Sequence, residues 1–176
     1  MTSELTGGTL AAPERVSVIN PEPTEDRERV ERLLGRRLNA EFAVAVRDAV
    51  GAPVVIRNAP FMDDGTPMPT LYWLVGAAEC DAVARLEAAG GVREAERSVD
   101  PNELIRAHER YAAERDVLVF STDAGPCPTG GVGGTRRGVK CLHAHLAWYL
   151  AGGEDPVGAW VASSLGLDRS VYAHCR

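Results

Sequence analysis

The sequence predicts a single α+β domain, in which about three antiparallel strands form a small sheet that four to five helices cover. The stretches with strand-type alternation come early in the chain, and most stretches with helical periodicity come after them. Strands and helices separated in this way favour an antiparallel sheet over a parallel sheet wound with helices. The 176 residues have the length of one ordinary domain, and 45% hydrophobic residues can supply its core.

The first helix is expected at residues 25–34, inside a domain that spans residues 22–166. Thr24 precedes this helix as a plausible N-cap, and Gly35 follows it as a terminator. Residues 1–21 are polar and contain Pro and Gly, which predicts a flexible N-terminal arm. Residues 167–176 are predicted to be a C-terminal tail with exposed His174 and Cys175.

A β-hairpin is predicted next. Phe42, Val44 and Val46 alternate with small residues, and residues 54–56 form a second β-branched run after a turn. Prolines and an Asp-Gly pair mark residues 58–70 as a loop, because proline removes a donor from a strand ladder. Residues 71–75 give the clearest strand pattern in the chain.

The remaining segments are predicted to be helical. One helix is expected over residues 79–89, where Gly90-Gly91 ends it. Another runs from Asp100-Pro101 to about Arg115, because an Asp N-cap followed by Pro is a helix start signal. Val117–Phe120 is either a short strand or the end of that helix. Further helices are expected over residues 139–151 and from Asp155-Pro156 for about ten residues.

Charge and composition limit the class of protein. The net charge of −6 disfavours binding to duplex nucleic acid, which needs a basic surface. No apolar run has the roughly 20 residues that a membrane helix requires. The first 12 residues lack the pattern of a secretory signal, so we expect a cytoplasmic protein with reduced cysteines.

The segment from Cys127 to His145 concentrates glycine, basic residues, thiols and imidazoles. A glycine-rich loop leads into the helix expected from Val139, and free backbone N–H groups at a helix N-terminus can hold an anion. The spacing differs from that of a P-loop, in which Lys follows the last Gly directly. The residues expected to bind an anionic ligand are Gly131, Gly133, Gly134, Arg136, Arg137 and Lys140.

Cys141 and His145 lie one helical turn apart if both belong to that helix, so they are expected to share a target while His143 points elsewhere. Three interpretations stay open. Cys141 is a nucleophile with His145 as its base; or both bind a metal such as zinc, and Cys127, His174 or Cys175 completes the site; or Cys141 is a small buried apolar residue and His145 a satisfied polar residue at the rim. Free cysteine is often buried, which favours the third interpretation.

Other polar residues are given structural interpretations. His108 lies in the middle of a predicted helix with apolar neighbours one turn away, which is typical of a histidine at the edge of a core. Asp63 and Asp64 are typical turn residues before glycine.

Two stretches together resemble the bacterial family called domain of unknown function 501. One is Pro60–Leu74, and the other is Val139–His145 with the glycine-rich loop before it and Asp155–Gly158 after it. The resemblance implies a small cytosolic protein without an established activity. It also implies gene neighbours that encode a septum-formation initiator and an exopolyphosphatase. This association adds a little weight to a phosphate-bearing ligand or to a role in the cell envelope.

The chain also departs from that family in its cysteines. Many members have Cys-Pro-Cys in the hairpin turn and a further Cys after the strand that follows. The corresponding positions here are near Asp48, Val50 and Gly76, and none is cysteine. A metal or redox centre built from those cysteines is therefore not expected in the same form.

Two hypotheses about function follow. The first is a ligand- or protein-binding or adaptor module that uses the glycine-rich loop to bind a phosphate-bearing small molecule or a protein partner. The second is a small thiol- or metal-dependent hydrolase or transferase that uses Cys141 and His145. The binding module is preferred, because a general base needs an orienting partner that the sequence does not identify.

Overall fold

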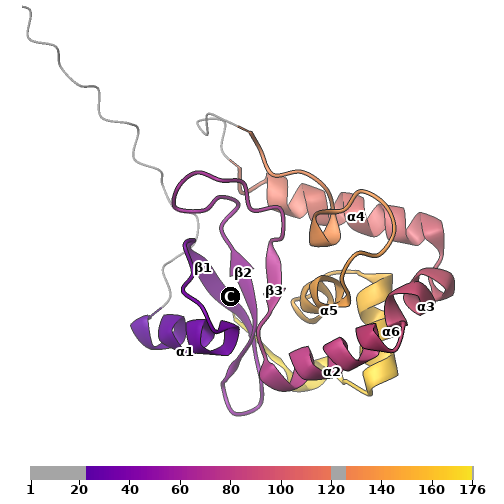
Figure 1. Cartoon of the computed structure of the whole chain (residues 1–176), viewed down its shortest axis with the longest axis horizontal. Helices are drawn as coiled ribbons and strands as arrows, with labels where there is room; N and C mark the ends of the chain where they lie inside the picture. Colours follow the sequence, from indigo (N-terminus) through magenta and orange to yellow (C-terminus); the bar gives the residue numbers. More distant parts are fainter. Residues whose placement is uncertain (1–22, 120–125, 176) are drawn as a thin grey trace, which may run out of the picture.

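The α+β fold predicted from the sequence is confirmed in a computed structural model, which describes residues 23–119 and 126–175 (Figure 1). The N-terminal arm expected at residues 1–21 lies outside the described residues. No helix among the described residues is both long and apolar enough to cross a membrane.

Four antiparallel strands form the sheet in the order β3-β2-β1-β4. The predicted hairpin and the strand after it are present as β1 (Phe42–Arg47), β2 (Pro53–Asn58) and β3 (Tyr72–Leu74). The fourth strand, β4 (Ala173–His174), was not expected. It lies in the predicted C-terminal tail and pairs with β1, although the His174 and Cys175 side chains are exposed as predicted.

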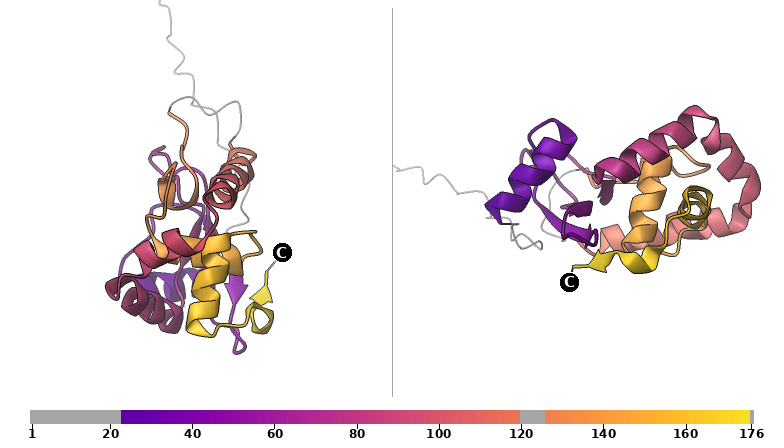
Figure 2. Two further views of the ribbon diagram at one scale, coloured as in Figure 1. Left: turned by 90° about the vertical axis from the view of Figure 1, so that its right-hand side faces the viewer. Right: turned by 90° about the horizontal axis from the view of Figure 1, so that it is seen from below.

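The helices lie on both faces of the sheet. Helix α1 (Thr24–Leu34) covers one face, and all other helices among the described residues lie on the opposite side (Figures 1 and 2). These are α2 (Ala77–Ala88), α3 (Gly91–Ser98), α4 (Pro101–Asp116), α5 (Leu142–Leu150) and α6 (Pro156–Leu165), with two short 3₁₀ turns, η1 (Val132–Gly134) and η2 (Arg169–Val171).

A β-bulge in β1 allows this strand to contribute to both cores. Val44 pairs with Ile56 and Val46 pairs with Val55, so the register shifts by one residue between the two pairs. A shift of one residue moves side chains to the other face of a sheet. Val44 and Ile56 accordingly pack under α1, whereas Val46 and Val55 belong to the larger core with the other helices.

Helix α5 crosses the larger core and contacts β3, α2, α6 and η1. Its position explains why most of its residues are buried, including Leu142, Leu146 and Leu150. The first turn of α5 reaches the surface beside α2, and this junction holds the candidate site.

Candidate functional site

The side chains of Glu87, Cys141 and His143 converge where α2 meets the start of α5. The donor atoms of the three side chains all lie within 4.8 Å of one another. His143 Nδ1 is 3.8 Å from Cys141 Sγ and 3.3 Å from Glu87 Oε1. A thiol, an imidazole and a carboxylate are thus directed at one point from two helices.

The start of α5 sets the direction of the Cys141 side chain. The sequence predicted a helix from Val139, but Cys141 is extended, with φ −153° and ψ 117°, and α5 begins at Leu142. The Leu142 N–H donates to Glu87 Oε1 at 2.6 Å. Glu87 therefore caps α5 from another helix, and its negative charge lies where the helix dipole favours it.

A backbone carbonyl orients the imidazole of His143. Nε2 lies 3.3 Å from the Cys80 carbonyl oxygen, which can only accept a hydrogen bond, so Nε2 is the donor and Nδ1 faces the thiol. The hydrogen bond with Cys141 is the largest cause that raises the pKa of His143 to about 9; burial opposes this rise, and the charge of Glu87 adds to it. This orienting partner could not be identified from the sequence.

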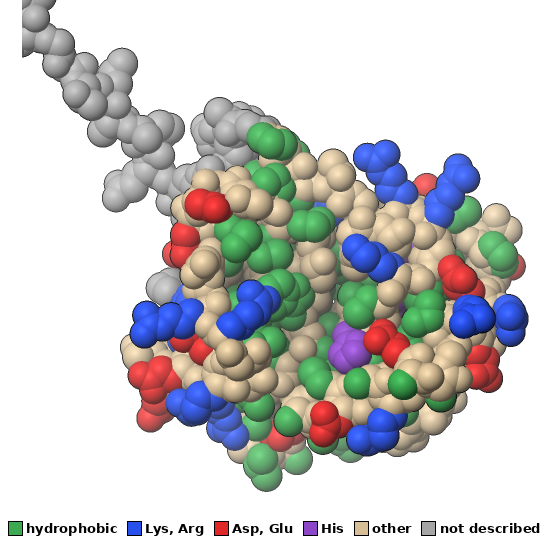
Figure 3. Space-filling model, viewed as in Figure 1, with side chains coloured by type: hydrophobic (Ala, Val, Ile, Leu, Met, Phe, Trp, Pro, Cys, Tyr) green, Lys and Arg blue, Asp and Glu red, His purple; other side chains and the backbone are tan. Residues whose placement is uncertain are grey.

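The cluster is accessible to solvent. The side chains of His143 and Glu87 are 28% and 27% exposed to solvent, and Cys141 is partly buried. Figure 3 shows a histidine beside an acidic side chain on the face where Figure 1 places α2 and α5. A small ligand or an ion can reach this position without a change of fold.

The structure does not bring His145 to this cluster, contrary to the geometry expected from the sequence. Its side chain is fully buried, and Nδ1 is 2.7 Å from Asp155 Oδ2. The expectation assumed that Cys141 was helical; the extended backbone of Cys141 instead places its thiol beside His143. The residue expected to point elsewhere, His143, is therefore the imidazole of the site.

The glycine-rich loop packs against α4. Val132 is buried, and its N–H donates to His108 Nδ1 at 3.1 Å. At Gly131 a Cβ atom would lie 2.5 Å from His108, so only glycine permits this approach. Gly133 and Gly134 have positive φ angles within η1. The Gly131 and Gly134 amides donate to backbone carbonyls of the same loop, at Thr135 and Gly131 respectively.

At the C-terminal end of the loop, where the sequence predicted a bound anion, the backbone N–H groups donate to glutamate side chains of the protein itself. Glu96 Oε1 accepts the Val139 N–H at 2.7 Å, as Glu87 accepts that of Leu142. Arg136, Arg137 and Lys140 are exposed. Arg136 turns out to line a cavity on α4, whereas Arg137 and Lys140 do not.

The remaining candidate residues lie elsewhere. Cys127, a candidate third metal ligand, is exposed and does not belong to the cluster. His108 is buried, as its apolar neighbours predicted. Asp64 accepts the Thr66 N–H in a turn, which agrees with the structural interpretation.

Sequence reasoning did not find Glu87. This residue lies on the partly exposed side of α2, 54 positions before Cys141, and its neighbours have the ordinary composition of a solvated helix. No local signal marks it, because its role follows from the packing of α2 on α5.

A model for a family described as "Protein of unknown function (DUF501)" matches residues 44–163. No curated protein and no solved structure matches the chain. The matched region runs from within β1 into α6 and contains the whole Glu87, Cys141 and His143 cluster.

Proposed function

Because the chain belongs to the DUF501 family of proteins of unknown function, we propose a function from its geometry: Glu87, Cys141 and His143 bind a zinc-type metal ion on which the activity depends. The observation that carries this proposal is the convergence of three different donor atoms within 4.8 Å. Thiolate, imidazole and carboxylate are the three side-chain ligands that zinc uses in proteins.

The distances between donors support a tetrahedral ion. With ordinary zinc bond lengths, a nitrogen and an oxygen ligand lie ~3.3 Å apart, and a nitrogen and a sulfur ligand ~3.6 Å apart. The corresponding distances from His143 Nδ1 are 3.3 Å to Glu87 Oε1 and 3.8 Å to Cys141 Sγ. All three donor atoms lie within 4.8 Å of one another, and rotamer adjustment would have to bring the Glu87 oxygen and the Cys141 sulfur to the ~3.6 Å separation of two zinc ligands.

The outer contacts of the ligands support the same proposal. A metal-bound histidine commonly donates its other ring N–H to a carbonyl or carboxylate, and metal-bound carboxylates accept hydrogen bonds of their own. His143 has such a partner in the Cys80 carbonyl, and Glu87 has one in the Leu142 N–H. These contacts hold both side chains in position before an ion arrives.

Three protein ligands leave a fourth zinc position for water or substrate, which is typical of catalytic rather than structural zinc sites. The partial exposure of His143 and Glu87 supports an open position that faces solvent. A zinc ion supplies Lewis acidity and lowers the pKa of bound water. Hydrolysis is therefore the reaction class that we propose.

The same Cys141–His143 pair also suits thiol chemistry, because Cys141 is at a helix N-terminus and His143 is oriented by a carbonyl. Glu87 favours the metal over this second function. A carboxylate beside a thiol disfavours the negative charge that a nucleophilic thiolate needs. A divalent cation at the same position would neutralise both groups.

Zinc binding tests the proposal directly. Untagged protein stripped with a chelator should take up one Zn²⁺ per chain, measured by elemental analysis and by competition with a chromophoric chelator. Loss of an outer hydrogen-bond partner alone costs roughly 10–100-fold in zinc affinity. Removal of a ligand by Glu87→Gln, Cys141→Ser or His143→Gln should therefore weaken binding by more than ~100-fold.

Glu96→Gln is the matched control for Glu87→Gln. Both carboxylates accept one backbone N–H in the same region, but only Glu87 belongs to the cluster. Cys80→Ser is the matched thiol control. Both controls should bind zinc like the wild-type protein; equal zinc affinity of the Cys141→Ser and wild-type proteins would disprove the proposed site.

A further inference from the structure

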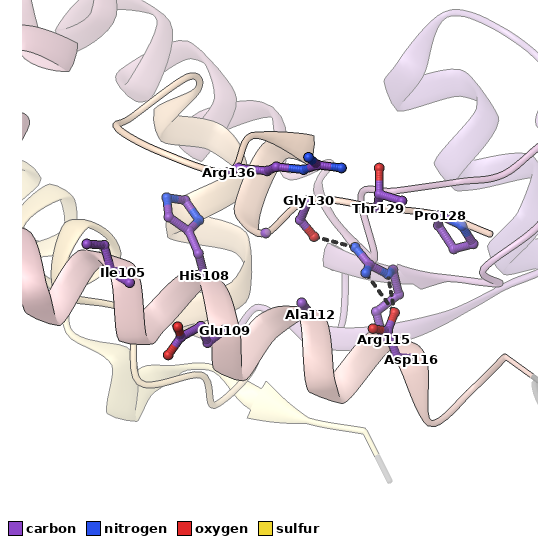
Figure 4. A pocket seen from close by; sticks show the side chains of 11 residues that line it. Ile105, His108, Glu109, Ala112, Arg115, Asp116, Pro128, Thr129, Gly130 and Arg136 are labelled. Atoms are coloured by element: carbon purple, nitrogen blue, oxygen red, sulfur yellow. Dashed lines mark hydrogen bonds and ion pairs between the residues drawn. The ribbon is translucent and has the colours of Figure 1, made fainter. Parts of the chain in front are cut away.

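We propose that a cavity between α4 and the loop 128–136 binds a small organic anion, with the anionic group on the Arg115 and Arg136 side and the apolar part against α4. This site shares no residue with the proposed metal centre. It uses one face of α4 and residues on either side of the glycine-rich loop (Figure 4).

The cavity is a shallow hollow with a volume of about 350 Å³, and most of it is open to solvent. Cavities of roughly 300–1,000 Å³ hold small-molecule ligands in proteins. Ile105, His108, Ala112 and Arg115 contribute to it from one side of α4, at spacings of three or four residues. Glu109 and Asp116 of the same helix also line it. The opposite wall is formed by Pro128, Thr129, Gly130, Gly131 and Arg136.

Arg115 provides a fixed positive group in the wall. It is only 2% exposed, and its guanidinium donates to the Asp116 carboxylate and to the Gly130 carbonyl. Within the described chain, these contacts use three of the five N–H groups of the guanidinium. The Asp116 carboxylate, which also lines the cavity, balances the charge of Arg115. Because both contacts hold the side chain in place, binding requires no further ordering of Arg115.

Arg136 provides a second and less restrained positive group. It is exposed, and none of the ion pairs within residues 23–119 and 126–175 involves it. Figure 4 shows its side chain extended above Gly130 on the same side as Thr129, whereas the Glu109 carboxylate points away from it. Arg136 is thus a positive group without an ion-pair partner among the described residues, and an oxyanion is its complement.

His108 shapes the cavity without contributing charge. Nδ1 accepts the Val132 N–H, and Nε2 is 3.0 Å from the Gly138 carbonyl oxygen, so both ring nitrogens are engaged. Burial lowers the pKa of His108, which favours the neutral form that this pair of contacts requires. The histidine therefore joins the loop to α4 within the wall of the cavity.

The apolar part of the cavity selects for more than an inorganic anion. Ala112 forms the middle of the α4 wall, and Ile105 remains 47% exposed at its end. An apolar group on the ligand would cover this surface, while phosphate or carboxylate oxygens reach Arg136. The ligand class is accordingly an organic phosphate or carboxylate with a flat or compact apolar body.

An NMR titration of ¹⁵N-labelled full-length protein with phenyl phosphate tests the proposal. Saturable shifts are expected for the Gly130, Gly131 and Ala112 amides. Arg136→Gln should weaken binding roughly tenfold, the effect of losing one charge-assisted hydrogen bond. Arg137→Gln removes the same charge one residue away, outside the cavity, and should bind like the wild-type protein.

Three results would overturn the inference. The first is the absence of saturable shifts at the cavity amides, and the second is an equal loss of binding in the Arg136 and Arg137 variants. The third is inorganic phosphate binding as tightly as phenyl phosphate, which removes the role of the apolar wall. Ala112→Phe fills the cavity without a change of charge; it should abolish the shifts, and retained binding in this variant would also refute the site.

Discussion

His145 and Asp155 form a fully buried pair that connects α5 to α6. Asp155 Oδ2 is 2.7 Å from His145 Nδ1, and the other carboxylate oxygen accepts the N–H groups of Val157 and Gly158 as the N-cap of α6. His145 Nε2 is buried without a hydrogen-bond partner among the described residues. A proton on Nδ1 agrees with both observations: Nδ1 then donates to Asp155, and Nε2 is an unpaired acceptor instead of an unpaired donor.

Substitution of Asp155 should therefore destabilise the fold more than that of an exposed helix cap. Asp155→Ala leaves three buried donors without an acceptor, the imidazole N–H and two amides. Each unsatisfied buried donor costs about 1–3 kcal/mol, so the total cost should be at least about 3 kcal/mol. Asp155→Asn retains an oxygen for the cap and should cost about 1–3 kcal/mol. Urea unfolding monitored by circular dichroism gives both values.

The exposed cap of α4 is the control for this prediction. Asp100 also accepts two amides, from Asn102 and Glu103, but none of its contacts among the described residues joins it to a buried side chain. Asp100→Ala should cost only about 0.5–2 kcal/mol, the usual contribution of a helix N-cap. An equal cost for the Asp100 and Asp155 variants would show that the His145 contact adds nothing to stability.

His143 should make the stability of the metal-free protein depend on pH. Its pKa is raised from 6.5 to about 9 in the folded protein, so the folded state holds this proton more tightly than the unfolded state does. The resulting stabilisation is complete below about pH 6.5 and is lost as the pH rises through about 9. The free energy of unfolding should fall over this range in wild-type protein and fall less in His143→Gln.

The groups that contact His143 also affect the pH dependence of the free energy of unfolding. Cys141 and Glu87 contact its ring, whereas burial raises the pKa of the Cys80 thiol to about 11, above this range. Zinc affinity should rise over the same range, because the metal displaces the proton from Nδ1. A pH profile of unfolding that is identical in wild-type and His143→Gln proteins would contradict the contact between the thiol and the imidazole.

At the level of elements, the helix starts that the sequence predicts well are those with local caps. Asp100-Pro101 and Asp155-Pro156 begin α4 and α6 where the sequence analysis placed them, and each Asp accepts two N–H groups of the first turn. Helix α5 has no such residue, since its cap is a carboxylate from α2. Its start was predicted three residues too early for this reason, and the wrong histidine was assigned to Cys141.

Helix α3 was not predicted, again because its start depends on packing and not on a local cap signal. Gly90 and Gly91 were interpreted as the end of the preceding helix, and α2 does end just before them at Ala88. Gly90 has φ 93°, which reverses the chain, and α3 begins directly at Gly91. A glycine pair can thus end one helix and begin the next, and only the packing of the short amphipathic segment after it distinguishes the two cases.

For the whole molecule, the alternation of the strands and the helical periodicity were sufficient to predict the fold class. The fourth strand was not predictable, because two residues carry no alternation pattern and their partner β1 is more than a hundred positions away. The two proposed binding sites also depend on distant pairs: Glu87 with Cys141, and Arg115 with Arg136. The sequence contained these residues but gave no sign of their proximity.

The edge of the sheet provides a final test of the whole fold. Strand β4 pairs with β1 at Val46 and Arg47, and the Cys175 N–H donates to the Ala45 carbonyl at 2.9 Å. A chain that ends at Tyr172 should lose about 1–3 kcal/mol, since each hydrogen bond contributes about 1 kcal/mol net. It should also self-associate through the exposed edge of β1. Urea unfolding measures the loss of stability, and light scattering measures the self-association. Full-length Cys175→Ser retains the backbone pairing and should resemble the wild-type protein. A truncated chain that is as stable as the full-length protein and monomeric would mean that β4 does not protect this edge.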